Sequence, residues 1–307
     1  MFAFSTCWNS ARHIDGRAML NEIRALGFEF AELSHGIRLS LVDGIQKAVA
    51  AGEIKISSLH NFCPLPVGVN GPAPDYYRPS ALREGERELA IRHTLRTLDF
   101  AASLSAPVVV LHLGAIEMRR YTEKLLDLFA AGRAQTPKFE RVREKALAVR
   151  AKKQPKFFEQ VLRSLDVIVP EAQKRKLKLG LETRFCLEEI PSETEVGELI
   201  RRYGVDTVAY WHDVGHAQVK ENFGLASQET MLRQYQSCTV GMHLQDFAPP
   251  AFDHQPPGGG TIDFSRLTPF VTEEMICAWE IHSPWPGEKI ATAVKQAQEI
   301  LRPKTTA

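Results

Sequence analysis

Short apolar, β-branched runs alternate with amphipathic helical stretches eight times along the chain, and this alternation constrains the fold more than any other feature. Strands and helices that alternate in this way form parallel β/α units, because a crossover helix returns the chain to the start of the next strand. Eight units predict a closed (β/α)8 TIM barrel, although periodicity alone is also compatible with an open doubly wound sheet. The predicted strands are Phe2–Cys7, Phe28–Leu33, Ile54–His60, Val108–Leu113, Leu177–Thr183, Val208–Asp213, Thr239–Gln245 and Met275–Ile281.

Two connections between these strands are longer than the others. The first, Asn61–Ser80, is rich in proline, glycine and asparagine, and a long aperiodic connection in a compact fold is typically functional, so we expect a lid. The second, 117–156, is expected to be a basic helical insertion after the fourth strand. Its twelve lysines and arginines against five acidic residues give a net charge of +7, which is typical of a solvated helix face. Helices are also predicted at Gly16–Leu26, Arg83–Leu104, Phe157–Lys176, Glu193–Tyr203 and Glu288–Leu301.

The composition is that of an ordinary globular protein, and 307 residues fit one barrel domain spanning 1–307. Lysines and arginines number 38 and acidic residues 37, so the net charge of +1 gives no overall argument for binding nucleic acid or an anionic membrane. No run has the apolar length of a membrane span, and the first residues lack a signal-peptide pattern. The five cysteines are odd in number and scattered, which predicts reduced thiols in a cytoplasmic protein.

Histidines and carboxylates gather where the predicted strands end. Eight of the ten histidines lie at or just beyond such an end. In a barrel these ends converge on one mouth, where catalytic side chains are found. One such residue alone is as often a cap or a structural histidine, but the same placement on six consecutive strands is much less easily explained in that way. The residues are His60, His112, Glu182, Asp213, His216, His243 and Glu280.

Four residues from successive strands predict a site for one divalent cation, because carboxylates and imidazoles approaching from several directions are the ligands such ions prefer. They are Glu182, Asp213, His243 and Glu280. The alternation of side chains along a strand turns His212 to the face opposite its neighbour Asp213, which favours a structural role. Glu32 ends the second strand, and the sequence leaves open whether it belongs to the site or to an ion pair.

Seven short motifs follow one another along the chain: HNFCP, LHLG, LETR, HDVGH, MHLQD, HQPPGGGTIDF and WEIH. No single motif is specific, but their order and spacing together resemble the xylose-isomerase-like barrel superfamily. The resemblance covers nearly the whole chain apart from the basic insertion. That superfamily contains isomerases and epimerases of sugars and sugar phosphates, hydroxypyruvate isomerase, and apurinic endonucleases of the endonuclease IV type.

The epimerase-type members imply that Glu182, Asp213, His243 and Glu280 bind one divalent ion, which can be manganese, zinc, magnesium or cobalt, with no organic cofactor. The resemblance also implies that Glu182 and Glu280 are the catalytic acid–base pair on opposite faces of the substrate carbon. Substrate contacts are expected from His60, His112, Glu188, His216 and His254. We therefore predict a metal-dependent isomerase or epimerase that moves a proton through a metal-stabilised enediolate of a sugar, sugar phosphate or hydroxy-keto acid.

The nuclease-type members imply a competing reading with three zinc ions, whose additional ligands match His60, His112, His216 and His254. An aspartate expected two residues before the last histidine is replaced by Phe252, and Asp253 follows one position late. We therefore expect no permanent three-zinc cluster. A β-eliminase with the same enolate chemistry and a non-catalytic sugar-binding barrel are further alternatives. The expected partner is a small sugar-derived substrate, without nucleic acid or membrane, and a homo-oligomer is left open.

Overall fold

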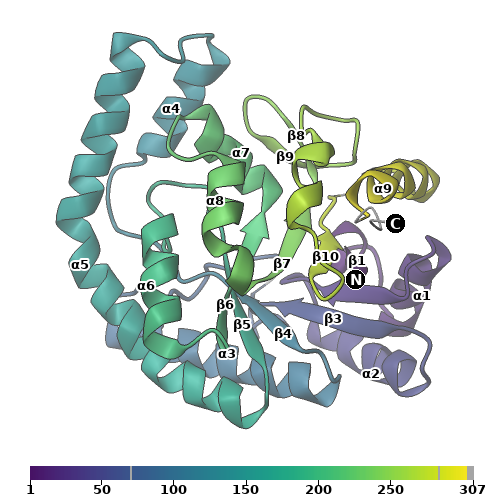
Figure 1. Cartoon of the computed structure of the whole chain (residues 1–307). Helices are drawn as coiled ribbons and strands as arrows, with labels where there is room; N and C mark the ends of the chain where they lie inside the picture. The colour runs from purple at the N-terminus through teal and green to yellow at the C-terminus, as the bar shows by residue number, and fades with distance from the viewer. Residues whose placement is uncertain (70, 283, 303–307) are drawn as a thin grey trace.

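Eight parallel strands close into a barrel in the computed structural model, which describes residues 1–69, 71–282 and 284–302 (Figure 1). Around the barrel the strands follow the order β1-β10-β7-β6-β5-β4-β3-β2, and β1 pairs with both β2 and β10. The closed ring confirms the predicted (β/α)8 fold over an open sheet. The barrel strands are β1 Phe2–Ser5, β2 Phe30–Leu33, β3 Lys55–His60, β4 Val108–Leu111, β5 Lys178–Glu182, β6 Val208–Asp213, β7 Thr239–Leu244 and β10 Ile276–Trp279.

The strands are apolar because both of their faces are covered, one by the barrel interior and the other by helices. All four residues of β4 are buried, for example. Trp211 fills the inside of the barrel, and two glycines on neighbouring strands make room for it. A Cβ atom at Gly241 would lie 2.3 Å from the Trp211 ring, and one at Gly180 would lie 3.1 Å from it. The barrel is therefore a packed core whose open end is the mouth formed by the strand C-termini.

Helices surround the strands on the outside (Figure 1). Their ends carry the expected signals, such as the capping box in which Ser192 and Glu195 satisfy each other's backbone N–H groups at the start of α6. The α-helices are α1 Gly16–Ala25, α2 Val42–Ala50, α3 Glu84–Ser103, α4 Tyr121–Ala130, α5 Pro137–Lys174, α6 Glu193–Tyr203, α7 Val214–Asn222, α8 Gln228–Tyr235 and α9 Gly287–Leu301. Short 3-10 turns are η1 Thr6–Trp8, η2 Leu39–Leu41, η3 Gln236–Cys238, η4 Phe264–Arg266 and η5 Thr268–Phe270.

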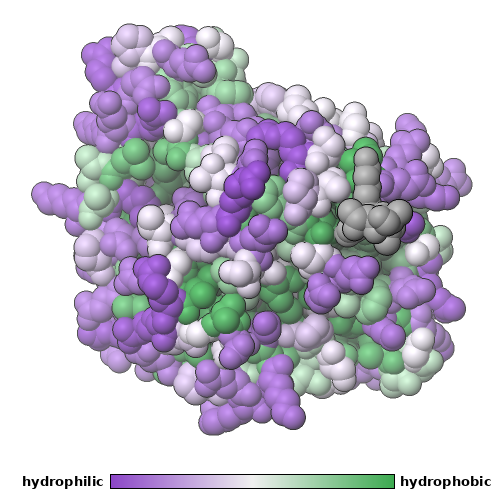
Figure 2. Space-filling view, in the orientation of Figure 1, coloured by the Kyte–Doolittle hydropathy of each residue, from purple (hydrophilic) through white to green (hydrophobic). Residues whose placement is uncertain are grey.

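The segment 117–156 is largely helical, but it does not end where the sequence suggested. Helix α5 runs for 38 residues and continues through Pro155, because burial of Phe157 and Phe158 just beyond it offsets the hydrogen bond that proline removes. Helix α4 and the start of α5 project beyond the barrel at the upper left of Figure 1. In Figure 2 this projecting end carries mostly hydrophilic surface, as expected for a solvated helix face.

A small antiparallel hairpin, β8 Asp246–Ala248 with β9 Phe252–Gln255, follows β7 and was not predicted. Asp246 fixes the glycine-rich turn beyond the hairpin, since its carboxylate accepts hydrogen bonds from the backbone N–H groups of Gly258, Gly260 and Ile262. The hairpin lies at the mouth of the barrel and carries His254. Among the described residues, no helix combines the length and the hydropathy that crossing a bilayer would require.

Candidate metal centre

The four predicted metal ligands meet at the mouth of the barrel. Glu182 ends β5, Asp213 ends β6, His243 lies near the end of β7, and Glu280 directly follows β10. Their exposed fractions are 1%, 0%, 0% and 3%. One ligand atom from each of the four lies within 4.8 Å of the others, which is the spacing that a single ion needs. The structure thus brings together all four side chains selected from the strand ends.

The Nδ1 atom of His243 is the centre of this cluster. It lies 2.9 Å from Glu182, 3.2 Å from Glu280 and 3.5 Å from Asp213. Burial raises the pKa of Glu182, but the charge of His112 and hydrogen bonds from histidines hold this pKa well below its usual range. Three carboxylates buried in so small a volume require compensating positive charge. The donor set therefore fits a divalent cation, with one imidazole and three carboxylates as ligands.

Glu32 joins this centre from the far side of His243. Its Oε2 atom lies 3.1 Å from Nε2 of His243 and accepts a hydrogen bond of 2.8 Å from Ser58. A carboxylate on Nε2 holds a proton on that nitrogen, so Nδ1 would be the atom that gives its lone pair to an ion among the three carboxylates. The question that the sequence left open is answered, because Glu32 lies inside the site and holds His243 in the orientation that a metal ligand needs.

A second group lies on the other side of Glu182 and consists of His60, His112 and Glu182. The Oε2 atom of Glu182 lies 2.5 Å from Nε2 of His112 and 3.4 Å from Nε2 of His60. An unpredicted residue, Arg184, enters this group with Nη1 2.8 Å from the same oxygen and hydrogen-bonded to Nε2 of His112. Arg184 belongs to the LETR motif, but it lies in the loop after the strand and arginine does not bind metal ions. The placement of metal-ligand residues at strand ends could therefore not predict it.

The connection 61–80, apart from residue 70, which lies outside the described residues, contains no helix or strand and reaches into the mouth, as expected of a lid. Asp75 on this connection lies 3.1 Å from Nδ1 of His112 and 3.7 Å from Arg184. Tyr77 stacks on His93 of α3 at a ring-centroid distance of 5.4 Å. Charge therefore holds Asp75 over the site and aromatic packing holds Tyr77, while hydrogen bonds from Cys63 and Ser80 fix the two ends of the connection.

A third group contains His216, Asp253 and His254. The Nδ1 atoms of His216 and His254 face the backbone carbonyls of Thr183 and Glu280, at 2.9 and 3.0 Å. The Nε2 atoms consequently face Asp253, at 3.9 and 3.7 Å. His254 has a positive φ of 55°, which breaks the strand alternation, so that Asp253 and His254 both turn toward the mouth. Phe252 is 63% exposed and lies outside the site.

Gln245 connects the first and third groups and was not predicted either. Its side-chain amide donates to both carboxylate oxygens of Asp213, at 3.0 and 2.9 Å, and its carbonyl oxygen accepts a hydrogen bond from the backbone N–H of His254. Gln245 stands in the MHLQD motif, directly after β7. It was not predicted because a side-chain amide carries no charge and the prediction relied on carboxylates and imidazoles. The orientation of Asp213 and the position of the hairpin therefore depend on the same side chain.

Glu188 is not placed as a substrate contact. Its two carboxylate oxygens bind the N-terminal end of α4, through the backbone N–H groups of Tyr121 and Thr122 and the Thr122 hydroxyl. A carboxylate is stabilised at this end of a helix, which accounts for its position. The structure thus argues against the expected contact. His212 lies away from the mouth, against Tyr210 and Gln228, as its structural reading required.

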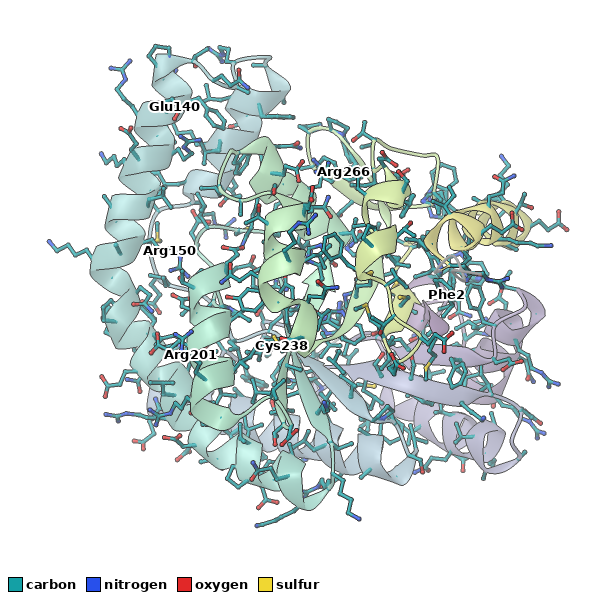
Figure 3. The ribbon with its side chains drawn as sticks, viewed as in Figure 1. Phe2, Glu140, Arg150, Arg201, Cys238 and Arg266 are labelled. Carbon is teal, nitrogen blue, oxygen red and sulfur yellow. The ribbon has the colours of Figure 1, made fainter. Side chains whose placement is uncertain are left out.

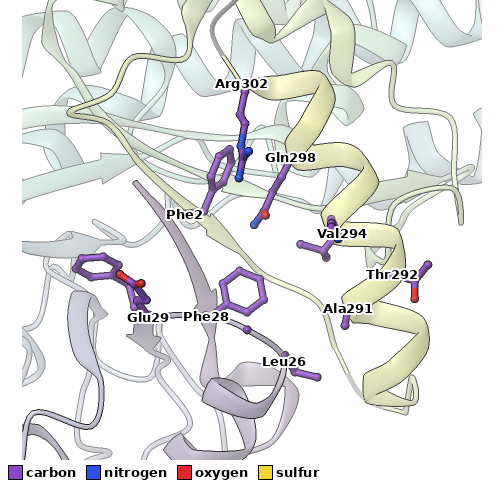
Figure 4. Close-up of a pocket in the computed structure, with 12 residues that line it drawn as sticks. Phe2, Leu26, Phe28, Glu29, Ala291, Thr292, Val294, Gln298 and Arg302 are labelled. Atoms are coloured by element: carbon purple, nitrogen blue, oxygen red, sulfur yellow. The ribbon is translucent and has the colours of Figure 1, made fainter.

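A hollow of about 580 Å³ lies at the opposite end of the barrel, where the strands begin (Figure 4). Its wall includes Phe2, Phe28, Val294 and Arg302. None of the clustered histidines or carboxylates described above lines it. A second hollow of about 980 Å³ borders Asp75 and Tyr76 of the connection 61–80. Because Asp75 contacts His112, the second hollow is the more relevant to the site.

Comparisons with known proteins agree with this architecture. A family model described as a xylose isomerase-like TIM barrel matches residues 20–304. A search of curated protein sequences finds no significant relative. Among solved structures, a putative xylose isomerase from Rhodospirillum rubrum has a TM-score of 0.70 at 16% identity, covering 98% of this chain and 97% of its own.

Two epimerase structures are similar to a comparable degree. The 3-keto-D-glucoside 4-epimerase of E. coli has a TM-score of 0.66 at 13% identity, covering 97% of this chain and 98% of its own. The D-psicose 3-epimerase of Clostridium cellulolyticum, solved with D-tagatose, has a TM-score of 0.65 at 11% identity, covering 98% and 99%. At these identities the likeness establishes the shared fold.

Proposed function

The chain belongs to the xylose isomerase-like TIM barrel family, and from this premise we propose that it is a divalent-metal-dependent isomerase or epimerase. Its proposed substrate is a sugar, a sugar phosphate or a hydroxy-keto acid. The observation that carries the proposal is the pair of buried glutamates, Glu182 and Glu280, which come from different strands and both lie against Nδ1 of His243. The similarity to two solved sugar epimerases gives it additional support.

The proposed ion is held by Glu182, Asp213, His243 and Glu280, the set whose ligand atoms already share one small volume. A divalent ion bound there supplies Lewis-acid stabilisation of the negative charge that develops on the substrate oxygens. Asp213 is kept in place by Gln245, and His243 by Glu32. These supporting contacts are the kind that fix the direction of metal ligands.

In the proposed reaction, one glutamate removes the proton from the carbon next to the carbonyl, and the other glutamate delivers a proton to the opposite face or to the adjacent carbon. Glu182 and Glu280 come from β5 and β10, which are separated by β6 and β7 around the ring, so the substrate carbon can lie between them. The lowered pKa of Glu182, caused by His112 despite burial, keeps it ionised at neutral pH, the state that accepts a proton.

The remaining polar groups at the mouth are proposed to bind and enclose the substrate. His60, His112, His216 and His254 provide ring nitrogens suited to sugar hydroxyl groups, and Asp75 belongs to a connection that excludes water when it is closed. The four proposed ligands are buried in the described conformation. The connection 61–80 must therefore move outward before a substrate can enter.

The first test measures proton exchange with solvent. The protein is incubated in D₂O with a divalent ion and with D-fructose, D-tagatose and D-psicose, among other keto sugars, and deuterium in the substrate is followed by NMR. We expect incorporation at the α-carbon, reduced at least about a hundredfold in Glu182→Gln and in Glu280→Gln, since each removes one proton-transfer group but keeps its shape. Turnover without any solvent exchange would rule out this mechanism.

The second test measures metal content directly. Asp213→Ala and His243→Ala each remove one ligand of the proposed set, and we expect both to lose the ion on dialysis, because the remaining groups leave the coordination sphere incomplete. Gln218→Ala, a residue of α7 that bonds only to other side chains away from the cluster, serves as the control. If both variants retain the ion fully, the assignment of Asp213 and His243 as metal ligands is wrong.

A second candidate function, metal-dependent phosphodiester cleavage, is favoured by one specific observation. Asp253 and His254 both face His216, so the carboxylate that the sequence placed out of register lies within the third group after all. Elemental analysis and anomalous scattering at the zinc edge separate the two functions. One ion at the Glu182–Asp213–His243–Glu280 set supports the isomerase, and ions at all three groups together with cleavage of an abasic oligonucleotide support the phosphodiesterase.

A further inference from the structure

Arg184 is an unusual presence in a group of metal-ligand side chains. It lies two residues beyond Glu182 and is only 4% exposed. Its Nη1 atom donates to Oε2 of Glu182 at 2.8 Å and lies against Nε2 of His112, while Nη2 donates to Glu189 at 2.6 Å. The guanidinium is therefore held on both sides and has a fixed position in the mouth.

Nη1 contacts two atoms of the His60–His112–Glu182 group, Oε2 of Glu182 and Nε2 of His112, which lie 2.5 Å apart. An ion bound there would need a lone pair of Oε2, and an N–H proton from Arg184 already occupies it. A guanidinium also carries a permanent positive charge, because its pKa lies far above neutral pH. The group thus holds a positive charge that is covalently part of the chain.

Glu182 divides its two oxygens between the neighbouring groups. Oε2 faces Arg184 and His112, whereas Oε1 lies 2.9 Å from Nδ1 of His243, within the four-residue metal set. A second divalent ion on the Oε2 side would meet both a blocked ligand oxygen and an adjacent fixed cation. Only the Oε1 side is free to accept an ion.

We propose that the Arg184 guanidinium takes the place of a cation in the His60–His112–Glu182 group and so excludes a metal ion from that position. The inference deepens the proposed function, on which it rests, since it limits the Glu182 carboxylate to a single metal ion. It also makes Arg184 a specificity-determining residue for metal stoichiometry. The third group, at His216, lies outside its reach and is not affected.

The test is a metal count with zinc as the probe. Each protein is freed of metal with a chelator, equilibrated with zinc by dialysis, and analysed for zinc per chain. Arg184→Met removes the charge and the N–H donors but keeps an unbranched side chain. We expect it to bind one more zinc per chain than the unchanged protein, and we expect Arg184→Met/His112→Ala to return to the original number.

Two further variants make the comparison specific. Arg184→Lys retains a positive charge at the group and is expected to keep the original zinc count. Arg150→Met is the matched control, since Arg150 on α5 is a part-buried arginine that bonds Glu195 through two nitrogens at 2.8 Å, outside all three groups (Figure 3). Its zinc count should also be unchanged, although it loses an ion pair of similar kind.

An unchanged count in a folded Arg184→Met would overturn the inference. If that variant does not fold, anomalous scattering at the zinc edge on crystals of the unchanged protein decides, and a peak between His60, His112 and Glu182 would contradict the proposal. Absence of zinc from the Glu182–Asp213–His243–Glu280 set would instead count against the proposed function. The two failures are therefore distinguishable.

Discussion

At the scale of single residues, the site shows how much depends on side chains that bind no ion themselves. Glu32, Gln245 and Arg184 each contact one of the proposed ligands and fix its direction or its charge. Such contacts limit the rotation of a ligand side chain, and ligands held in the right geometry bind with less loss of conformational freedom. The geometry and the charge of the proposed metal centre therefore depend on these neighbours as well as on the ligands.

Glu32→Gln is predicted to weaken divalent-ion binding by about ten- to a hundredfold. Glutamine keeps the shape but supplies a neutral acceptor, so Nε2 of His243 is held less firmly and the imidazole is less basic. The dissociation constant is measured by competition with a chelator, and Glu29→Gln, an exposed carboxylate just before the same strand, is the control. If Glu32→Gln lowers the melting temperature of the metal-free protein but leaves the affinity for the ion unchanged, the role of Glu32 is merely structural.

Residue patterns predicted the proposed ligands because these are charged or imidazole groups at strand ends, and strand ends converge. They could not predict the role of Glu32, since its partner His243 is 211 residues away and the contact crosses the inside of the barrel. The arrangement of Asp253 and His254 was also missed, because it depends on one left-handed backbone conformation in β9. Sequence spacing alone assumes regular alternation and fails where the backbone departs from it.

At the scale of elements, the connection 61–80 is the part of the site that we propose must move. Its two ends are tied to the barrel, since the Cys63 N–H donates to Thr97 and the Ser80 hydroxyl donates to the Ala115 carbonyl. Between these ends, Asp75 pairs with His112 and Arg184, and Tyr77 stacks on His93. An outward movement of this middle part would have to break these contacts, as active-site lids do when they open.

Asp75→Ala is predicted to release this connection. The hydrogen bond to a charged partner contributes about 1.5 kcal/mol at a partly exposed site, so amide hydrogen exchange over residues 61–80 should become roughly tenfold faster. The measurement is hydrogen exchange followed by mass spectrometry of the corresponding peptides. Tyr76→Ala, in the same connection but exposed, should leave the exchange rate nearly unchanged. Equal exchange in Asp75→Ala and the unchanged protein would show that Asp75 is not an anchor.

The junction between α6 and α7 gives a prediction on pH. Burial raises the pKa of Glu193, but the charge of Lys220 outweighs burial and leaves this pKa below its usual value. A carboxyl group with a lowered folded-state pKa stabilises the fold above its unfolded pKa of about 4.3, and this contribution disappears as the pH falls through the lowered value. Urea unfolding of the unchanged protein and of Glu193→Gln should therefore differ in free energy at pH 7 and converge toward pH 3.5. A difference that stays constant over this range would disprove the linkage.

At the scale of the whole molecule, the alternation of strands and helices was enough to predict the barrel. Predicted and observed strands agree within two residues at every end, and the Val208–Asp213 strand agrees at both ends. The VVVL run of β4 is the clearest case of the apolar pattern that burial on two faces favours. The β8–β9 hairpin was missed because its strands are short and polar, and the length of α5 because a proline usually ends a helix.

The whole molecule is predicted to gain stability when an ion binds. Glu32, Glu182, Asp213 and Glu280 are buried carboxylates around one imidazole, and the folded state alone arranges them together. At an ion concentration a hundredfold above the dissociation constant, binding stabilises the folded state by about 2.7 kcal/mol, which corresponds to a rise in melting temperature of roughly 4 °C. Scanning calorimetry before and after adding the ion to chelated protein measures this rise, and His243→Ala should show none. A rise of equal size in His243→Ala would place the ion elsewhere.

The seam that closes the barrel joins β1 to β10, and the amino group of Met1 bonds the carbonyl of Met275, 274 positions along the chain. At 5 to 20 residues per second, a ribosome needs roughly 14 to 55 s to make the chain between them. Throughout that interval β1 presents an unpaired edge, and a growing polypeptide with such an edge is a natural client for chaperones. Glu280 follows directly on β10, so the last proposed ligand is synthesised together with the strand that completes the ring. Closing the barrel and completing the proposed metal centre would therefore be one event, possible only after β10 has been synthesised.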